Sequence, residues 1–195
     1  DIGDVTYDHL KSVLCKYGYV NCKLMMDHIN IQAQVRDSIL YLDMPINIPG
    51  QVKAEFTIAT TDLRKITVYG ASKIETLGEQ SLTLNSLTLD LNGAAEADLT
   101  LAVNDLNIDA KGASKLELEG TANNAHITIA GAGKLDADEL IVQKMHINCA
   151  GASQADIHVE GELRAQAAGA SRINYKGTPV IKQKMAVGGS FIVRD

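Results

Sequence analysis

The sequence predicts an all-β protein, built as a single parallel β-helix, or solenoid, with coils of about 19–20 residues. Three observations lead to this prediction. A glycine-rich triplet recurs at nearly constant spacing, and apolar and polar residues alternate around each copy with the period of two that is typical of half-buried strands. In addition, hydrophobic residues reach 46% but aromatic residues only 4%, so the core must be built from Leu, Ile, Val and Ala.

Composition and charge exclude several classes of protein. The 195 residues include 18 Lys and Arg, 24 Asp and Glu, and three Cys, which gives a net charge of -6. These values exclude a disordered chain, a collagen and a cysteine-rich mini-protein, and the acidic balance argues against a nucleic-acid partner. The longest apolar run is Ile39–Leu42, whereas a transmembrane helix needs about 20 apolar residues, so we expect no transmembrane segment.

The first 50 residues carry the pattern less regularly. We expect residues 1–195 to form one domain, with residues 1–50 as less regular coils or a cap and residues 51–195 as regular repeats. Because an open end of a β-helix exposes unpaired backbone, we expect the apolar segment before Asn30 to cover the first coil or to extend the sheet irregularly. Cys15 and Cys22 lie close enough in sequence for a disulfide in an exported protein, or both are buried thiols.

Each triplet consists of a glycine followed by two small residues. Seven copies start 23, 19, 19, 20, 18 and 19 residues apart, at Gly70, Gly93, Gly112, Gly131, Gly151, Gly169 and Gly188. We interpret each copy as a tight corner. A Cβ atom on the glycine would crowd the next coil there, and the small residues beside it let successive corners approach closely.

Alignment on the first glycine of each copy gives columns of like residues. The column four positions after the glycine is apolar throughout: Ile74, Ala97, Leu116, Leu135, Ala155, Ile173 and Ile192. The columns two and four positions before the glycine are also apolar, and polar residues lie between them. We therefore expect these three columns to point inward and to stack about 4.8 Å apart in successive coils.

Short strands at this spacing could instead form a propeller or a sandwich. A propeller blade needs about 40 residues, and a sandwich needs Asn-Gly or Asp-Gly hairpin turns at its strand ends. The chain has one such dipeptide, Asn92-Gly93, and it lies inside a triplet. The solenoid is therefore the better fit.

The iterated triplets, together with the segments that begin at Gly131 and Gly169 and run on to Leu140 and Pro179, resemble a known family. This is the family called "putative auto-transporter adhesin, head GIN domain", and the resemblance covers residues 50–195 best. It implies a right-handed parallel β-helix and an exported protein, in the periplasm or on the outer cell surface of a Gram-negative bacterium. No signal peptide precedes Asp1, which is consistent with a signal removed before this residue. The resemblance implies no established activity and no catalytic residues.

Two outward columns carry charge. The position three after the glycine is mostly basic and the position five after it is mostly acidic, and residues two apart share one face of a strand. The candidate binding residues in these columns are Lys73, Glu75, Asp98, Lys115, Glu117, Lys134, Asp136, Asp156 and Arg172. One interpretation is a solvated surface on which the charges neutralise each other; the other is a groove for Ca²⁺ or a sugar.

A second outward column, five positions before the glycine, contains His126 and His146. The two imidazoles should stack on successive coils, with Asp109 and Asn148 in the neighbouring column, and such a pair could hold Zn²⁺ or Ni²⁺. Structural zinc sites usually have four protein ligands, so the alternative is two exposed histidines at ordinary surface positions. We predict no metal site and no cofactor.

Catalytic signatures are not found: the sequence has no G-x-S-x-G, H-E-x-x-H, P-loop or C-x-x-C motif. We expect an exported surface protein that binds a partner such as a glycan or another surface protein without catalysis, and we leave its oligomeric state open. The alternative is a pectinase-like, carbohydrate-active enzyme that uses the Asp98, Asp136 and Asp156 column, since β-helices also carry such enzymes. The short coils argue against it, because they leave no pocket that encloses a substrate.

Overall fold

The structure of the protein is a computed structural model. It describes residues 13–15, 18–24, 32–36, 39–43, 54–60, 62–78 and 81–195. The chain divides into two compact units, Asp1–Asp62 and Leu63–Asp195, and we describe each by itself.

The first unit contains two small antiparallel sheets. One joins β1 (Val13–Cys15), β2 (Gly18–Leu24) and β5 (Ala54–Thr60), and the other joins β3 (Gln32–Arg36) and β4 (Ile39–Asp43). The regular repeats were expected to begin at residue 51, but β5 pairs antiparallel with β2 and the parallel coils begin at Lys65. The thiols of Cys15 and Cys22, and most of the expected capping segment before Asn30, lie outside the described residues.

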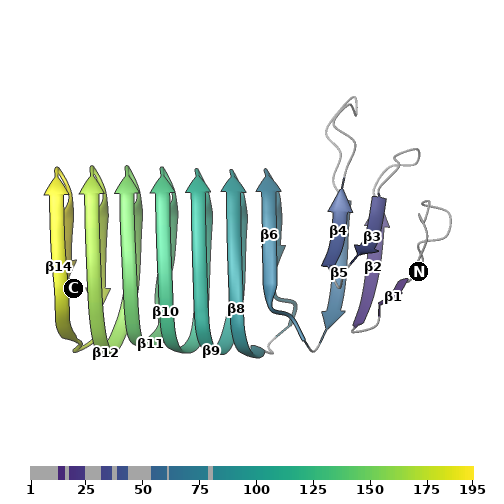
Figure 1. Ribbon diagram of the computed structural model, residues 1–195, viewed down its shortest axis with the longest axis horizontal. Coiled ribbons are helices and arrows are strands. Elements are labelled where there is room, and N and C mark those ends of the chain that lie inside the picture. Colours follow the sequence, from purple (N-terminus) through teal and green to yellow (C-terminus); the bar gives the residue numbers. More distant parts are fainter. Residues whose placement is uncertain are drawn as a thin grey trace. The chain divides into compact units, whose positions relative to one another are not determined.

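The second unit is a parallel β-solenoid of about seven turns, as the repeats predict, and the described residues form no helix. Its strands pair in parallel with the strand one coil away, so they lie side by side in chain order (Figure 1). The strands are β6 (Lys65–Gly70), β7 (Lys73–Glu75), β8 (Leu82–Gly93), β9 (Glu96–Gly112), β10 (Lys115–Gly131), β11 (Lys134–Gly151), β12 (Gln154–Gly169), β13 (Arg172–Lys176), β14 (Val180–Gly188) and β15 (Phe191–Arg194).

The observed register is the one that the glycine alignment predicts. Leu116 pairs with Ala97 on one side and with Leu135 on the other, and the column continues through Ala155 and Ile173. All five side chains are buried, so the alternation of inward and outward residues is confirmed. The core is a stack of aliphatic side chains, and Tyr175 is its one aromatic residue among those described.

The glycine corners explain why the coils can stack so closely. Gly131 has a φ of 120°, and a Cβ atom added there would lie 2.3 Å from the carbonyl oxygen of Gly112 in the coil before. That same carbonyl accepts a hydrogen bond from the Ala132 amide at 2.8 Å. The corner therefore needs a residue without a side chain, because the backbones of successive coils bond to each other directly.

The serine of the triplet completes the corner. The Ser171 hydroxyl donates to the carbonyl oxygen of Ala168 at 2.7 Å and lies 3.1 Å from that of Cys149 in the coil before. Ser171 and Ser153 are buried, so these serines are structural parts of the corner. The coils thus present their variable side chains outward at fixed positions, and this arrangement places the candidate sites.

Candidate functional site

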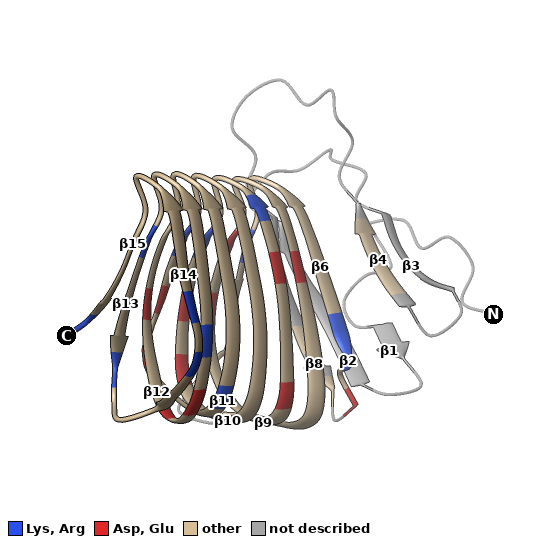
Figure 2. Ribbon diagram, turned by 60° about the vertical axis from the view of Figure 1, so that its left-hand side comes forward, with Lys and Arg blue, Asp and Glu red and all other residues tan. Residues whose placement is uncertain are grey.

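The candidate binding residues lie on the strand that follows each glycine corner. We call the surface formed by the positions three and five after the glycine the charge ladder: Lys73, Glu75, Glu96, Asp98, Lys115, Glu117, Lys134, Asp136, Gln154, Asp156, Arg172 and Asn174. The structure brings these residues into register across β7, β9, β10, β11, β12 and β13. In Figure 2, basic and acidic positions both recur on the outer sides of neighbouring strands.

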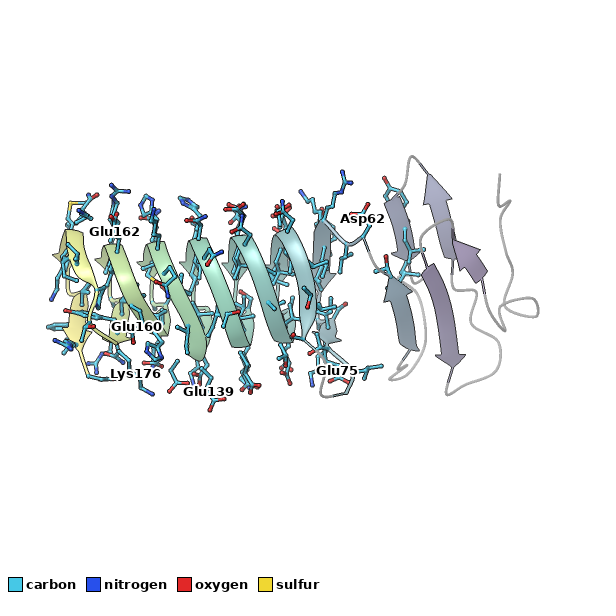
Figure 3. The ribbon with its side chains drawn as sticks, turned by 90° about the horizontal axis from the view of Figure 1, so that it is seen from below. Asp62, Glu75, Glu139, Glu160, Glu162 and Lys176 are labelled. Carbon is cyan, nitrogen blue, oxygen red and sulfur yellow. The ribbon has the colours of Figure 1, made fainter. Side chains whose placement is uncertain are left out.

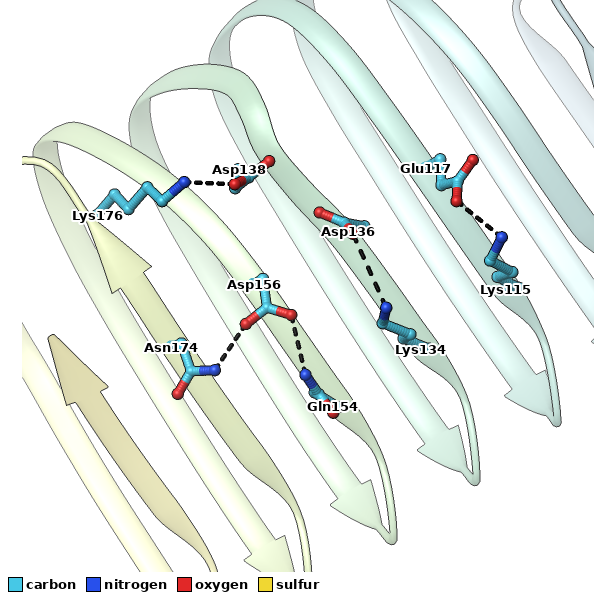
Figure 4. A network of polar contacts seen from close by, with 9 residues as sticks. All are labelled: Lys115, Glu117, Lys134, Asp136, Asp138, Gln154, Asp156, Asn174 and Lys176. Atoms are coloured by element: carbon cyan, nitrogen blue, oxygen red, sulfur yellow. Dashed lines mark hydrogen bonds and ion pairs between the residues drawn. The ribbon is translucent and has the colours of Figure 1, made fainter. Parts of the chain in front are cut away.

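The charges of the ladder are engaged mainly with each other (Figure 4). Lys73 lies 2.6 Å from Glu75, and Lys115 lies 2.7 Å from Glu117, two residues along the same strand. Lys134 approaches Asp136 at 3.9 Å. The hydrogen bond from Lys115 and its positive charge lower the pKa of Glu117, and the same bond raises the pKa of Lys115.

The two ends of the ladder use neutral or aromatic partners. Asp156 accepts hydrogen bonds from the side-chain amides of Gln154 at 3.0 Å and Asn174 at 2.6 Å. The Arg172 guanidinium lies 5.9 Å from the centre of the Phe191 ring, a distance at which a cation–π contact is favourable. A carboxylate so engaged is stabilised in its ionised form and is not prepared to act as a general acid.

The charge ladder is a flat surface. Its Lys and acidic side chains in ion pairs are 40–50% exposed, and exposed pairs of this kind contribute about 0–1 kcal/mol each. The only hollow found along it, beside Lys73, Asp98 and Lys115, has a volume of about 60 Å³. Ligand pockets are typically about 300–1,000 Å³, so this surface can contact a partner but cannot enclose one.

His126 and His146 are brought together as the sequence predicts. They pair across β10 and β11, and their rings meet edge to face with centroids 4.7 Å apart. Asp109, in the neighbouring column, is bound to Lys111 at 2.6 Å. No group of three or more His, Cys, Asp or Glu side chains in the described part of the chain is placed to hold a metal ion, so the pair stands without a third ligand of these types there.

The surface around the two histidines contains a larger hollow that the sequence analysis missed. This polar hollow has a volume of about 440 Å³ and is lined by Asp105, Leu106, Asn107, Asn124, Ala125, His126, Lys144, Met145, His146, Glu162 and Arg164. Its polar residues come from the columns five and seven positions before the glycine. In Figure 3, Glu162 of this hollow and Glu75 of the charge ladder lie on opposite sides of the solenoid. The signal was readable in the sequence by counting back seven positions, but that column mixes amides, acids and a lysine.

Comparison with known proteins supports the fold and gives a family. The family described as "putative auto-transporter adhesin, head GIN domain" matches residues 25–179. None of the curated proteins matches the chain. Solved structures do match. The crystal structure of a putative adhesin from Bacteroides fragilis superposes with a TM-score of 0.80 at 22% identity, covering 91% of this chain and 83% of that one.

Two further structures come from Parabacteroides distasonis. A putative adhesin has a TM-score of 0.67 at 19% identity, over 91% of this chain and 84% of that one. A protein described as a putative lipid binding protein has a TM-score of 0.60 at 16% identity, over 93% and 86%. At these identities the likeness shows the fold alone. Within the residues that the structure describes, no helix is long and apolar enough to cross a bilayer.

Proposed function

Because the chain belongs to the family described as "putative auto-transporter adhesin, head GIN domain", we propose that it is an exported, adhesin-like binding module of the cell envelope. It holds an extended partner, a glycan or another surface protein, against a flat side of the solenoid, and it carries out no catalysis. The observation that supports this function is the in-register stacking of outward side chains. Each coil repeats the same side-chain positions about 4.8 Å further along the axis, which suits a long ligand better than a small substrate.

The charge ladder is the proposed contact surface for a protein partner. Its charges are exposed and alternate in sign along each strand, so a partner with the opposite pattern could replace the internal pairs. Contact through such a surface is weak and sensitive to salt, since exposed charges are screened over about 8 Å at physiological ionic strength.

The enzymatic alternative receives less support from the geometry. A pectinase-like mechanism needs an acid and a base that face a bound sugar across a cleft. Asp98, Asp136 and Asp156 lie on a flat surface, and Asp136 and Asp156 already have partners on their own strands. The described residues form no deep cleft over these carboxylates.

Reversal of two ladder charges tests the contact surface. We expect Asp136→Lys with Asp156→Lys to reduce binding to bacterial or host cell surfaces, with the thermal melt close to that of the wild type. The matched control is Glu119→Lys with Glu139→Lys, which changes the net charge equally at exposed positions outside the ladder. Unchanged binding by the Asp136/Asp156 variant would exclude the ladder. A reducing-sugar assay on the wild type with pectin would reveal hydrolysis and so contradict the non-catalytic function.

A further inference from the structure

The polar hollow differs from the charge ladder in how its charges are engaged. Both of its carboxylates already have partners: Asp105 accepts from the Asn124 amide at 2.8 Å, and Glu162 lies 3.8 Å from Lys182. Lys144 and Arg164, by contrast, have no acidic partner among the residues that the structure describes. The hollow therefore has two unneutralised cations at its edge and no unengaged carboxylate, which favours an anionic ligand.

A second observation points to a ligand at the same place. The Nε2 atom of His146 is shielded from solvent and has no hydrogen-bond partner. An unpartnered buried ring nitrogen is costly, and it is satisfied most simply by a group that enters the hollow. The pKa of His146 is lowered by burial first, then by His126 and by Arg164.

The charged and titratable groups around this ring come from three strands. They are His126 on β10, Lys144 on β11, and Glu162 and Arg164 on β12. Three of the four are basic, and the acidic one is engaged by Lys182. A carboxylate bound beside His146 would thus be attracted by its surroundings, and by linkage it would make the imidazole easier to protonate.

The size and the remaining lining define the ligand further. A volume of about 440 Å³ exceeds that of a simple inorganic anion and falls within the range of small-ligand sites. The amides of Asn107 and Asn124 add neutral donors and acceptors, which suit hydroxyl groups. The hollow is also open along the solenoid axis, so a unit bound in it can belong to a longer chain.

We propose that the polar hollow binds one carboxylate-bearing sugar unit of an acidic glycan, with Lys144 and Arg164 on the carboxylate and His146 hydrogen-bonded through its free ring nitrogen. This inference rests on the proposed binding function and gives it a ligand class, at a surface opposite the charge ladder. A guanidinium can bind a carboxylate through two parallel hydrogen bonds, whereas a lysine adds a point charge. The two histidine rings form the floor on which the sugar lies.

The probe for this site is trigalacturonic acid, with the galactose trisaccharide of the same linkage as its uncharged counterpart. Calorimetry on the full chain should show binding of the acidic trisaccharide and at least tenfold weaker binding of the neutral one. We expect Lys144→Gln with Arg164→Gln to lose about tenfold or more in affinity, because each removes a charged hydrogen bond. The control is Lys115→Gln with Lys134→Gln, which removes the same charge from the ladder and should leave the affinity unchanged.

Equal losses in both double variants would mean diffuse charge attraction and would overturn the site, as would equal binding of the two trisaccharides or no binding at all. An NMR titration of the imidazole signals adds a specific readout: the acidic trisaccharide should raise the pKa of His146, and an unmoved titration overturns its contact. Failure here is separable from failure of the proposed function. The latter is read from cell-surface binding by the ladder variants, the former from trisaccharide binding by the hollow variants.

Discussion

At the scale of single residues, Cys149 shows how the solenoid core changes chemistry. It lies in the inward column two positions before the glycine, is 2% exposed, and stacks between Ile129 and Ala167 of the neighbouring coils. Burial in this apolar surrounding raises the pKa of the thiol to about 11, since desolvation disfavours the thiolate. The sequence places this cysteine inward by its column, but the size of the shift depends on how completely the adjacent coils cover it.

The raised pKa predicts a loss of stability at alkaline pH. Below pH 9 the thiol is protonated in both states, so its contribution is fully present. Between pH 9 and 11 the unfolded thiol ionises and the folded one does not, and stability falls by up to about 1.4 kcal/mol per pH unit. Urea unfolding at pH 8, 9 and 10 should show a smaller loss for Cys149→Ala than for the wild type. Ala occupies the same column at Ala167, so the variant should fold; parallel pH curves would contradict the burial.

At the scale of one strand, β10 separates core packing from surface charge within two adjacent residues. Leu116 is fully buried, whereas Lys115 is half-exposed and bound to Glu117. We expect Leu116→Ala to reduce the free energy of unfolding by about 2–5 kcal/mol, because it leaves a cavity between stacked coils. Lys115→Glu should cost far less, since it breaks one exposed pair. Denaturant melts of both variants measure the difference; the opposite ranking would mean that the inward and outward faces are exchanged.

The strands were predictable because two local rules agree. The glycine corner fixes where each coil starts, and the period of two then fixes which side chains point inward. No such rule applies before Lys65, where β5 pairs antiparallel with β2 across more than 30 residues of sequence. That pairing depends on contacts between distant segments, and the column pattern contains no record of them.

The candidate sites were predictable to different depths for a related reason. Stacking of His126 on His146 follows from register alone. The polar hollow does not, since it depends on whether the long side chains of Lys144 and Arg164 fold against neighbours or remain free. In the charge ladder, likewise, the columns were evident, but the pairing of Lys115 with its own strand's Glu117 is a matter of side-chain geometry.

At the scale of the whole solenoid, the edge strand is the feature that the repeats do not handle by themselves. All nine residues of β14 are exposed, including Val180, Met185 and Val187, and β14 pairs with β12 alone among the described strands. A long apolar edge of this kind is a template for pairing with another chain. Natural sheets reduce that risk by placing a charge where the next layer would need an apolar side chain.

Lys184 occupies that position in this solenoid. Its column is Ile66, Leu89, Ile108, Ile127, Ile147 and Ala165 in the earlier coils. The Lys184 ammonium lies 5.7 Å from the centre of the Tyr175 ring, which is 7% exposed. The methylene stem can therefore cover the end of the core while the charge remains in water, in a cation–π contact with the ring.

This arrangement predicts that Lys184 opposes end-to-end association. In Lys184→Leu the apolar column would continue to the edge, and a further strand could stack on it without burying a charge. Sedimentation velocity over a range of protein concentrations should show more self-association for Lys184→Leu than for the wild type. Lys134→Leu is the matched control, since it makes the same exchange at an outward position in the middle of the solenoid. If both variants sediment alike, the association is a general effect of added apolar surface and Lys184 has no special role at the edge.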